Sequence, residues 1–288
     1  MQVQWYPGHM TKAKRAMKED MKLVDLVIEI LDARAPLSSR NPDIDELGRG
    51  KARMILLGKA DLADESANRK WEQFFKEKGF VTVRADSRRR AEMKPIQAAV
   101  KEACREKKER DLRRGIKNRP VRAMVVGIPN VGKSTFINSY AGRACAKTGN
   151  RPGVTRGNQW IRLGKDVELL DTPGILWPKF EDEQVGIRLA FLGSVKDEIL
   201  GMEELALRLL AFLKENYPES LKERYQLSGA DLSAEPPSML MEIARLRNCL
   251  LRGNELDSEK AARLLIDDFR SGRLGAITLE FPGWEQEE

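Results

Sequence analysis

The first part of the chain alternates short, almost wholly apolar runs with longer stretches in which apolar and polar residues mix. Short runs rich in Val, Ile and Leu are typical of strands buried on both faces of a parallel sheet. Such runs lie at residues 23–32, 52–57, 80–83 and 121–126, and residues 158–163 and 167–170 predict a hairpin around residues 164–166. The stretches between them, such as 65–78 and 93–110, have the pattern of helices. This alternation predicts a doubly wound α/β domain.

The pattern changes after about residue 178. Apolar residues then recur at helical spacing, which predicts helices over residues 184–192, 202–216, 237–252 and 258–270, the last with Ser258 as its N-cap. These stripes are typical of a packed core. We therefore expect an α/β domain over residues 1–178 and a small all-helical domain over residues 179–288.

The segment Gly127-Ile-Pro-Asn-Val-Gly-Lys-Ser134 fits the pattern G-x-x-x-x-G-K-[S/T] of a phosphate-binding loop. It follows the apolar run at 121–126 and precedes a predicted helix, which is the context that the motif requires. Its backbone N–H groups and the helix N-terminus favour phosphate oxygens. A plain glycine turn is the competing interpretation, but it does not explain why Lys-Ser stands at the required place. The predicted nucleotide contacts here are Asn130, Val131, Gly132, Lys133, Ser134 and Thr135, with Lys133 on the β- and γ-phosphates and Ser134 on Mg²⁺.

Two further positions downstream suit a nucleotide with a γ-phosphate. Asp171, in Asp171-Thr-Pro-Gly174, is expected to hold Mg²⁺ through water, and the Gly174 N–H is expected to touch the γ-phosphate. Thr155 lies between the two motifs, where a switch loop would close its hydroxyl and carbonyl on Mg²⁺ and the γ-phosphate. Lys133, Thr155 and Gly174 are the catalytic candidates among these residues.

The run at 52–57 delivers Gly58-Lys-Ala-Asp61 to its carboxyl end, where open α/β sheets place ligands. This segment is similar to the Asn-Lys-x-Asp motif that reads guanine. The Asp61 carboxylate would accept from the ring N–H and the exocyclic amine, a pair of donors that adenine lacks, and the Lys59 stem would cover a face of the base. Ala85-Asp-Ser87 stands in the place of the second base loop, so Ala85, Asp86 and Ser87 are further candidates. Taken together, the motifs predict a GTPase that uses GTP, GDP and Mg²⁺.

The order of these motifs is unusual. A Ras-like GTPase runs from phosphate loop to switch to Asp-x-x-Gly and then to the base motif. Here Lys59 and Asp61 come first, and the phosphate loop, Thr155 and Asp171 follow. The sequence therefore predicts a circularly permuted Ras-like domain, with the helical domain added directly after the second switch, the Asp-x-x-Gly segment at residues 171–174.

The whole pattern resembles the circularly permuted GTPases, and among them the ribosome biogenesis GTPase A (YlqF/RbgA) family. The resemblance covers nearly the whole chain and rests on Trp5-Tyr-Pro-Gly-His-Met10, Asp32-Ala-Arg-Ala-Pro36, Gly58-Lys-Ala-Asp61, residues 127–134, Arg151-Pro-Gly-Val-Thr155, Asp171-Thr-Pro-Gly174 and residues 268–280. It implies GTP hydrolysis in late maturation of the large (50S) ribosomal subunit, coupled to release, with a C-terminal domain that docks on rRNA. It also implies a catalytic His9 and a K⁺ ion held by Asn130.

Two departures bear on these expectations. Position 58 is Gly where the family usually has Asn, which predicts weaker nucleotide binding, while Asp61 retains the guanine preference. The residues after Gly174 are Ile and Leu, and neither can orient water as the Gln of Ras-like enzymes does. The missing polar group is the reason for looking to His9.

The charge of the chain suggests a polyanionic partner, with ordinary solubility charge as the alternative. The 288 residues carry a formal net charge of +7, and residues 111–122 form a basic linker that either is simply solvated or contacts RNA. Lys12, Lys14, Arg15, Arg113 and Arg114 are the candidate phosphate contacts. Three scattered cysteines and the lack of a long apolar run favour a reducing, cytoplasmic setting. We expect a monomer when free, with no membrane or DNA partner. A non-catalytic GTP-sensing RNA-binding module and a GTPase serving another RNA or membrane cargo remain alternatives.

Overall fold

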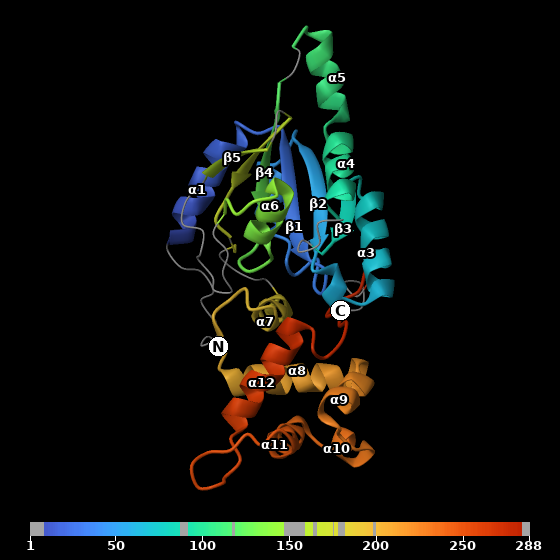
Figure 1. Cartoon of the computed structure of the whole chain (residues 1–288), viewed down its shortest axis with the longest axis vertical. Helices are drawn as coiled ribbons and strands as arrows, with labels where there is room; N and C mark the ends of the chain where they lie inside the picture. The colour runs from blue at the N-terminus through green and yellow to red at the C-terminus, as the bar shows by residue number, and fades with distance from the viewer. Residues whose placement is uncertain are drawn as a thin grey trace. The chain divides into compact units, whose positions relative to one another are not determined.

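The computed structural model describes residues 9–86, 92–116, 119–146, 159–163, 166–174, 176–177, 182–197 and 200–283 (Figure 1). The chain divides into two compact units, one of residues 2–182 with residues 278–288, and one of residues 183–277. The division differs from the sequence prediction at its end, because the helical unit stops at Ile277 and the last residues of the chain belong to the first unit. Buried side chains at Thr278, Leu279 and Glu280 explain this return.

A six-stranded sheet forms the centre of the first unit, with strand order β3-β2-β1-β4-β6-β5. All strands run parallel except β5, which pairs antiparallel with β6 as the predicted hairpin. All seven residues of β1 are buried, as its apolar run requires. The strands are β1 (Leu26–Asp32), β2 (Ala52–Gly58), β3 (Val81–Ala85), β4 (Val121–Val126), β5 (Gln159–Leu163) and β6 (Val167–Asp171). The predicted doubly wound α/β architecture is confirmed.

Helices pack against this sheet through two apolar clusters. Met17 and Met21 of α1 pack with residues of β1, β4 and β6, and Trp71 and Phe75 of α3 pack with residues of β1 and β2. The Asp64 carboxylate caps α3 by accepting from the N–H groups of Ser66 and Ala67. The helices of the unit are α1 (His9–Met21), α2 (Asp43–Leu47), the 3₁₀ turn η1 (Ala60–Leu62), α3 (Glu65–Glu77), α4 (Met93–Ala103), α5 (Arg105–Arg113) and α6 (Lys133–Ala141).

The predicted helix over residues 93–110 is divided at Cys104 into α4 and α5. Helical hydrogen bonds continue across the division, from the Cys104 N–H to the Val100 carbonyl at 3.2 Å and from the Lys108 N–H to the Cys104 carbonyl at 2.9 Å. The second helix buries no residue and extends away from the sheet (Figure 1). Its last residues, 111–113, are also the first of the basic segment at 111–122, so this segment begins as helix rather than as linker.

The second unit is all helical, as predicted. Its core comes mainly from Leu205, Leu209 and Leu213 of α8 with apolar residues of α11 and α12. The elements are α7 (Glu183–Phe191), α8 (Met202–Asn216), α9 (Pro218–Tyr225), α10 (Gly229–Ser233), α11 (Pro236–Leu246) and α12 (Ser258–Ser271). Among the described residues, no helix is both long and apolar enough to span a membrane.

Three predictions for this unit were inaccurate. The sequence pattern missed α9 and α10, although Pro218 opens the first and a Ser228–Asp231 capping box opens the second. The helix α11 ends at Leu246, earlier than predicted. The N-cap of α12 is Asp257 rather than Ser258, because the Asp257 carboxylate accepts from the Lys260 N–H at 2.9 Å.

Candidate functional site

The carboxyl ends of the parallel strands bring the predicted motifs to one edge of the sheet. The phosphate loop follows β4, the base segment follows β2, and Asp171 is the last residue of β6. Because β1 and β4 are neighbours in the middle of the sheet, the turn after β1 lies at the same edge. Open α/β sheets bind ligands at such a point, where neighbouring strands lead their connections in opposite directions.

The phosphate loop needs its glycines for steric reasons. Gly127 has φ of 155°, and a Cβ there would lie 2.6 Å from the Ile30 carbonyl oxygen. Gly132 has φ of 104° and Asn130 has φ of 60°, so the loop passes twice through the left-handed region. This backbone turns the loop tightly between β4 and α6, as the motif predicted.

Lys133 is almost fully buried inside this loop. Its Nζ donates to the carbonyl oxygens of Gly127 and Ile128, each at 2.9 Å. Burial lowers the pKa of Lys133 to about 8, and the negative charge of Asp171 opposes that shift. The ammonium group is therefore held inside the loop, where it donates to two neutral carbonyls.

Asp171 provides a carboxylate that suits a bound cation. Its side chain is buried, and its Oδ1 has no hydrogen-bond partner in the described part of the chain. Burial raises the pKa of Asp171, and the charge of Lys133 opposes the rise. A buried carboxylate oxygen without a donor is costly unless a cation or water accompanies it. The described residues contain no group of three or more His, Cys, Asp or Glu side chains that could hold a metal ion.

Gly174 brings the second switch directly against the phosphate loop. A Cβ at this position would lie 2.7 Å from the Pro129 nitrogen and 2.9 Å from Lys133 Nζ. No side chain fits there without displacing the loop. The structure thus brings Lys133, Asp171 and Gly174 together, as the motifs predicted.

Lys59 joins the base segment to the phosphate loop. Its backbone is left-handed, with φ of 54°, and its Nζ donates to Asp32 Oδ2 and to the Asn130 carbonyl, each at 2.9 Å. The sequence predicted only that the Lys59 stem covers the base. Asp61, the residue predicted to bind guanine, lies two residues after Lys59, within the 3₁₀ turn η1. The hydrogen bonds of Lys59 therefore fix the start of the turn that carries Asp61.

Asp32 and Arg34 support Lys59 and were not among the predicted site residues. Arg34 Nε donates to Asp32 Oδ1 and Arg34 Nη2 to Asp32 Oδ2, both at 2.9 Å, and both side chains are buried. Burial alone would raise the pKa of Asp32, but the charges and hydrogen bonds of Arg34 and Lys59 outweigh it and hold that pKa below its usual range. The signal was present in Asp32-Ala-Arg-Ala-Pro36, but nothing in its spacing revealed the contact with Lys59.

The remaining candidates divide into two groups. Ala85 and Asp86 are buried at the end of β3, and the Asp86 N–H donates to the Glu92 carboxylate. Ser87 and Thr155 lie outside the described residues. His9 is the first residue of α1, but its side chain also lies outside what the structure describes.

Similarity to known proteins, in sequence and in fold, indicates one family for this chain. A family model described as "50S ribosome-binding GTPase" matches residues 122–232. A ribosome biogenesis GTPase A of Bacillus cereus is 48% identical over 98% of this chain and 95% of its own length, and one of Thermotoga maritima is 33% identical over 96% and 94%. The crystal structure of GNP-bound YlqF from T. maritima superposes with a TM-score of 0.67 at 28% identity, covering 94% of this chain and 99% of that one. The identities extend over nearly the whole chain and the fold agrees with the superposed structure, so the chain belongs to the ribosome biogenesis GTPase A family.

Proposed function

We propose that this GTPase acts in late maturation of the large (50S) ribosomal subunit, binds rRNA there and couples GTP hydrolysis to its own release. The observation that carries the proposal is the Lys59 contact with the Asn130 carbonyl, which joins a guanine-reading loop to a phosphate loop in one site. The names of the relatives support the ribosomal assignment, because they are ribosome biogenesis GTPases.

The chain's own residues supply most of what hydrolysis needs. Lys133 neutralises charge on the β- and γ-phosphates, and the Gly174 N–H meets the γ-phosphate where its missing Cβ leaves room. Ser134, Thr155 and Asp171 would hold Mg²⁺, which supplies electrostatic stabilisation of the phosphates when bound. The buried Asp171 Oδ1 supports that assignment.

The attacking water needs a polar group from outside the second switch. Leu176 is buried, so its side chain belongs to the core. We assign the role to His9, on the resemblance of Trp5-Tyr-Pro-Gly-His-Met10 to the family, and a K⁺ ion to Asn130 on the same basis. A cation there would neutralise charge that develops in the transition state, as an arginine finger does.

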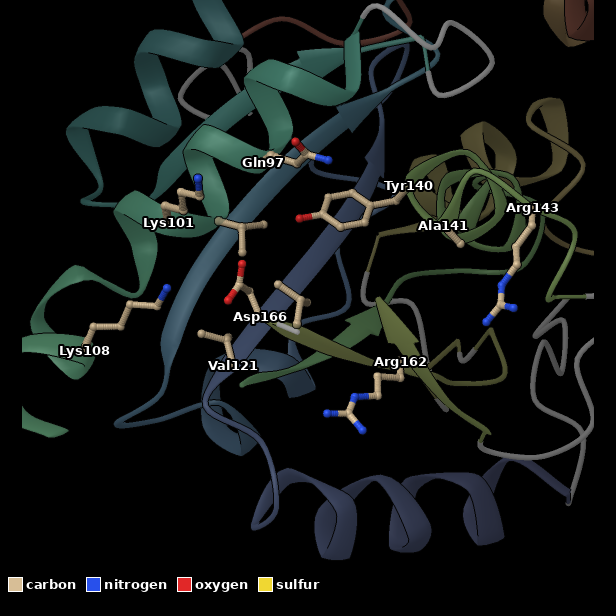
Figure 2. Close-up of a pocket in the computed structure, with 11 residues that line it drawn as sticks. Gln97, Lys101, Lys108, Val121, Tyr140, Ala141, Arg143, Arg162 and Asp166 are labelled. Atoms are coloured by element: carbon tan, nitrogen blue, oxygen red, sulfur yellow. The ribbon is translucent and has the colours of Figure 1, made fainter. Parts of the chain in front are cut away.

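A recess in the α/β unit suits a phosphodiester backbone, and we assign it to rRNA. Its volume is 490 Å³, and Figure 2 shows Lys101 and Lys108 along one side, Arg143 and Arg162 along another, and Asp166 between them. Within the described residues none of these four cations forms an ion pair. Burial raises the pKa of Tyr140 to about 12, with Cys104 adding to the shift, so its phenol remains a hydrogen-bond donor at neutral pH.

The position of the recess leaves the nucleotide site free. Val121 and Val167, which line it, are the first residues of β4 and β6. The phosphate loop and Asp171 lie at the other ends of the same strands. RNA held in the recess therefore does not compete with GTP.

The test is the salt dependence of binding to purified large subunits. Changing Lys101, Lys108, Arg143 and Arg162 together to Gln should weaken binding and reduce the slope of log K against log salt by about 3, since each phosphate contact contributes about 0.7–0.9. The matched control alters the net charge equally by changing four exposed cations of α3 and its C-cap, namely Arg69, Lys70, Lys76 and Lys78.

Equal losses of subunit binding in both quadruple variants would contradict the assignment of the recess to rRNA. The four cations would then contribute only to the general charge of the protein. Binding to free RNA or to membranes with no preference for large subunits would favour the alternative of another cargo. Tight GTP binding without turnover, with or without subunits, would favour a non-catalytic sensor.

A further inference from the structure

The last described residues of the chain are built into the α/β unit. Thr278, Leu279 and Glu280 are each at most 4% exposed, although they follow the helical unit directly. Phe281 packs against the cluster that contains Trp71 and Phe75. A charged residue such as Glu280 is seldom buried without a specific set of donors.

Glu280 finds these donors in the turn that follows β1. Its Oε1 accepts from the Ser38 N–H at 3.0 Å and from the Leu37 N–H, and its Oε2 accepts from the Ser38 hydroxyl at 2.6 Å. The Leu279 N–H donates to the Arg34 carbonyl at 2.7 Å. The C-terminal segment, residues 278–281, thus fixes the backbone of the turn over residues 34–38.

The same segment also holds the loop that carries Asp61. The Thr278 hydroxyl accepts from the Asp64 N–H at 3.0 Å, and the Trp71 indole N–H donates to the Glu280 carbonyl at 3.0 Å. Asp64 is the N-cap of α3 and stands three residues after Asp61. The end of the base loop is therefore fixed by the C-terminal segment on one side and by its own helix on the other.

The turn over residues 34–38 and the end of the base loop are both linked to the candidate nucleotide site by short chains of hydrogen bonds or of sequence. The turn over residues 34–38 carries Arg34, which pairs with Asp32, and Asp32 accepts from Lys59 at 2.9 Å. Lys59 in turn donates to the phosphate loop. The C-terminal segment thus supports Lys59 through Arg34 and Asp32, and Asp61 through Asp64.

We propose that Thr278 and Glu280 are positioning residues of the guanine site, which hold Lys59 and Asp61 where the base is read. The proposal rests on Asp61 as the guanine-reading residue. It deepens the assignment of the site, because it makes the end of the chain, beyond the helical unit, part of guanine recognition. A purely structural role would lower thermal stability but leave the choice between bases unchanged.

The test uses paired variants of the full-length chain. Thr278→Val removes the hydroxyl and keeps the shape, whereas Thr278→Ser keeps the hydroxyl. Glu280→Leu removes both acceptor oxygens. Glu280→Gln keeps one oxygen, which can still accept from the Leu37 and Ser38 N–H groups, and its amide N–H can donate to the Ser38 hydroxyl. Affinities for GDP and IDP are measured with a fluorescent GDP analogue as competitor, together with melting temperatures. Inosine lacks the exocyclic amine, so the ratio of the two affinities reports the bidentate contact of Asp61.

Thr278→Val is expected to weaken GDP binding about threefold to tenfold and to narrow the GDP-to-IDP ratio, while Thr278→Ser stays within about twofold of the parent. Glu280→Leu should show the same loss and Glu280→Gln should restore most of it. An unchanged affinity ratio in every folded disruptive variant would overturn the proposal. If Glu280→Leu does not fold, the isosteric Thr278→Val decides.

An Asp61→Asn variant separates this proposal from the assignment on which it rests. If that variant does not shift its preference from GDP to XDP, the base reader is assigned wrongly. If it does shift while Thr278→Val discriminates against IDP like the parent, only the positioning role is overturned.

Discussion

Lys133 and Asp171 are both buried, and burial favours the uncharged form of each side chain. It lowers the pKa of Lys133 to about 8 and raises that of Asp171. Each charge opposes the shift of the other, so the proximity of the two residues offsets part of the effect of burial on both pKa values. The sequence located both residues, but the depth of burial depends on β4 and β6 as neighbours.

The affinity for GTP should fall as the pH rises above about 8, because free Lys133 then loses the proton that phosphate binding requires. The slope of log Kd approaches one per pH unit. For stability the sign is the opposite: an unfolded lysine keeps its proton to about pH 10.4, so between these values the Lys133 contribution to the free energy of unfolding increases with pH. Equilibrium titrations with GTP from pH 7 to pH 9 check the affinity.

The control for this titration is Lys133→Arg, whose guanidinium does not titrate in that range. Any ionisation of the ligand affects both proteins alike and cancels in the comparison. An identical pH slope in the parent and in Lys133→Arg would show that Lys133 is not the titrating group.

Gly174→Ala should reduce kcat/KM for GTP about a hundredfold, because its Cβ forces the second switch or the phosphate loop to move. The melting temperature should change little if the switch is the part that moves. Gly229→Ala is the matched control, since a Cβ at Gly229 meets nothing within 4 Å. Unchanged turnover in Gly174→Ala would remove Gly174 from the γ-phosphate site.

Gly58 differs from the Asn usual in the family, and the structure offers a way to measure the effect. A Cβ at this position would lie 3.3 Å from Ile30 Cγ2, so Gly58→Ala and Gly58→Asn share one small steric cost. The amide of Gly58→Asn should then tighten GTP binding relative to Gly58→Ala by about 1–3 kcal/mol. Calorimetric titration of both variants isolates the amide, and equal affinities would show that it has no role here.

At the scale of elements, the strands and the loops at their ends were predictable because buried parallel strands have a simple apolar signature. The contact of Lys59 with Asp32 was not, because it depends on the left-handed backbone of Lys59 and on β1 pairing with β2. The C-terminal segment was also missed. Its partner Ser38 lies 242 positions earlier, and no local pattern reports such a distance.

Asp268 holds the helical unit together at the end of α12. Its fully buried carboxylate accepts from Arg224 Nε at 2.7 Å and from the Tyr225 hydroxyl at 2.9 Å, and it also pairs with Arg273. Burial alone would raise the pKa of Asp268, but these partners outweigh it and lower the pKa. The stabilisation is therefore present above the unfolded pKa of about 3.9 and is lost as the pH falls through the lower folded value.

Asp268→Asn should lower the free energy of unfolding of the helical unit by about 1–3 kcal/mol at neutral pH. Asp267→Asn is the control, since Asp267 is the exposed neighbour on the same helix. Chemical denaturation followed by circular dichroism measures both variants. Equal midpoints would mean that the Asp268 network adds no stability.

At the scale of the whole molecule, the motifs of the nucleotide site follow a permuted order along the chain. The connections have moved while the strands keep the positions that a nucleotide site requires. The helical unit follows the second switch, and the C-terminal segment then returns to the base loop. The net charge of +7 suits a polyanionic partner, and the recess lined by Lys101 and Arg162 is the site that we propose for rRNA.

The most direct measurement is the rate of GTP turnover with and without purified large ribosomal subunits, for the parent and for His9→Ala. We expect slow hydrolysis by the free protein and a rise of about tenfold or more on adding large subunits, with the rise lost in His9→Ala while GTP affinity stays within a few-fold. A parent turnover rate that large subunits leave unchanged would contradict the proposed function.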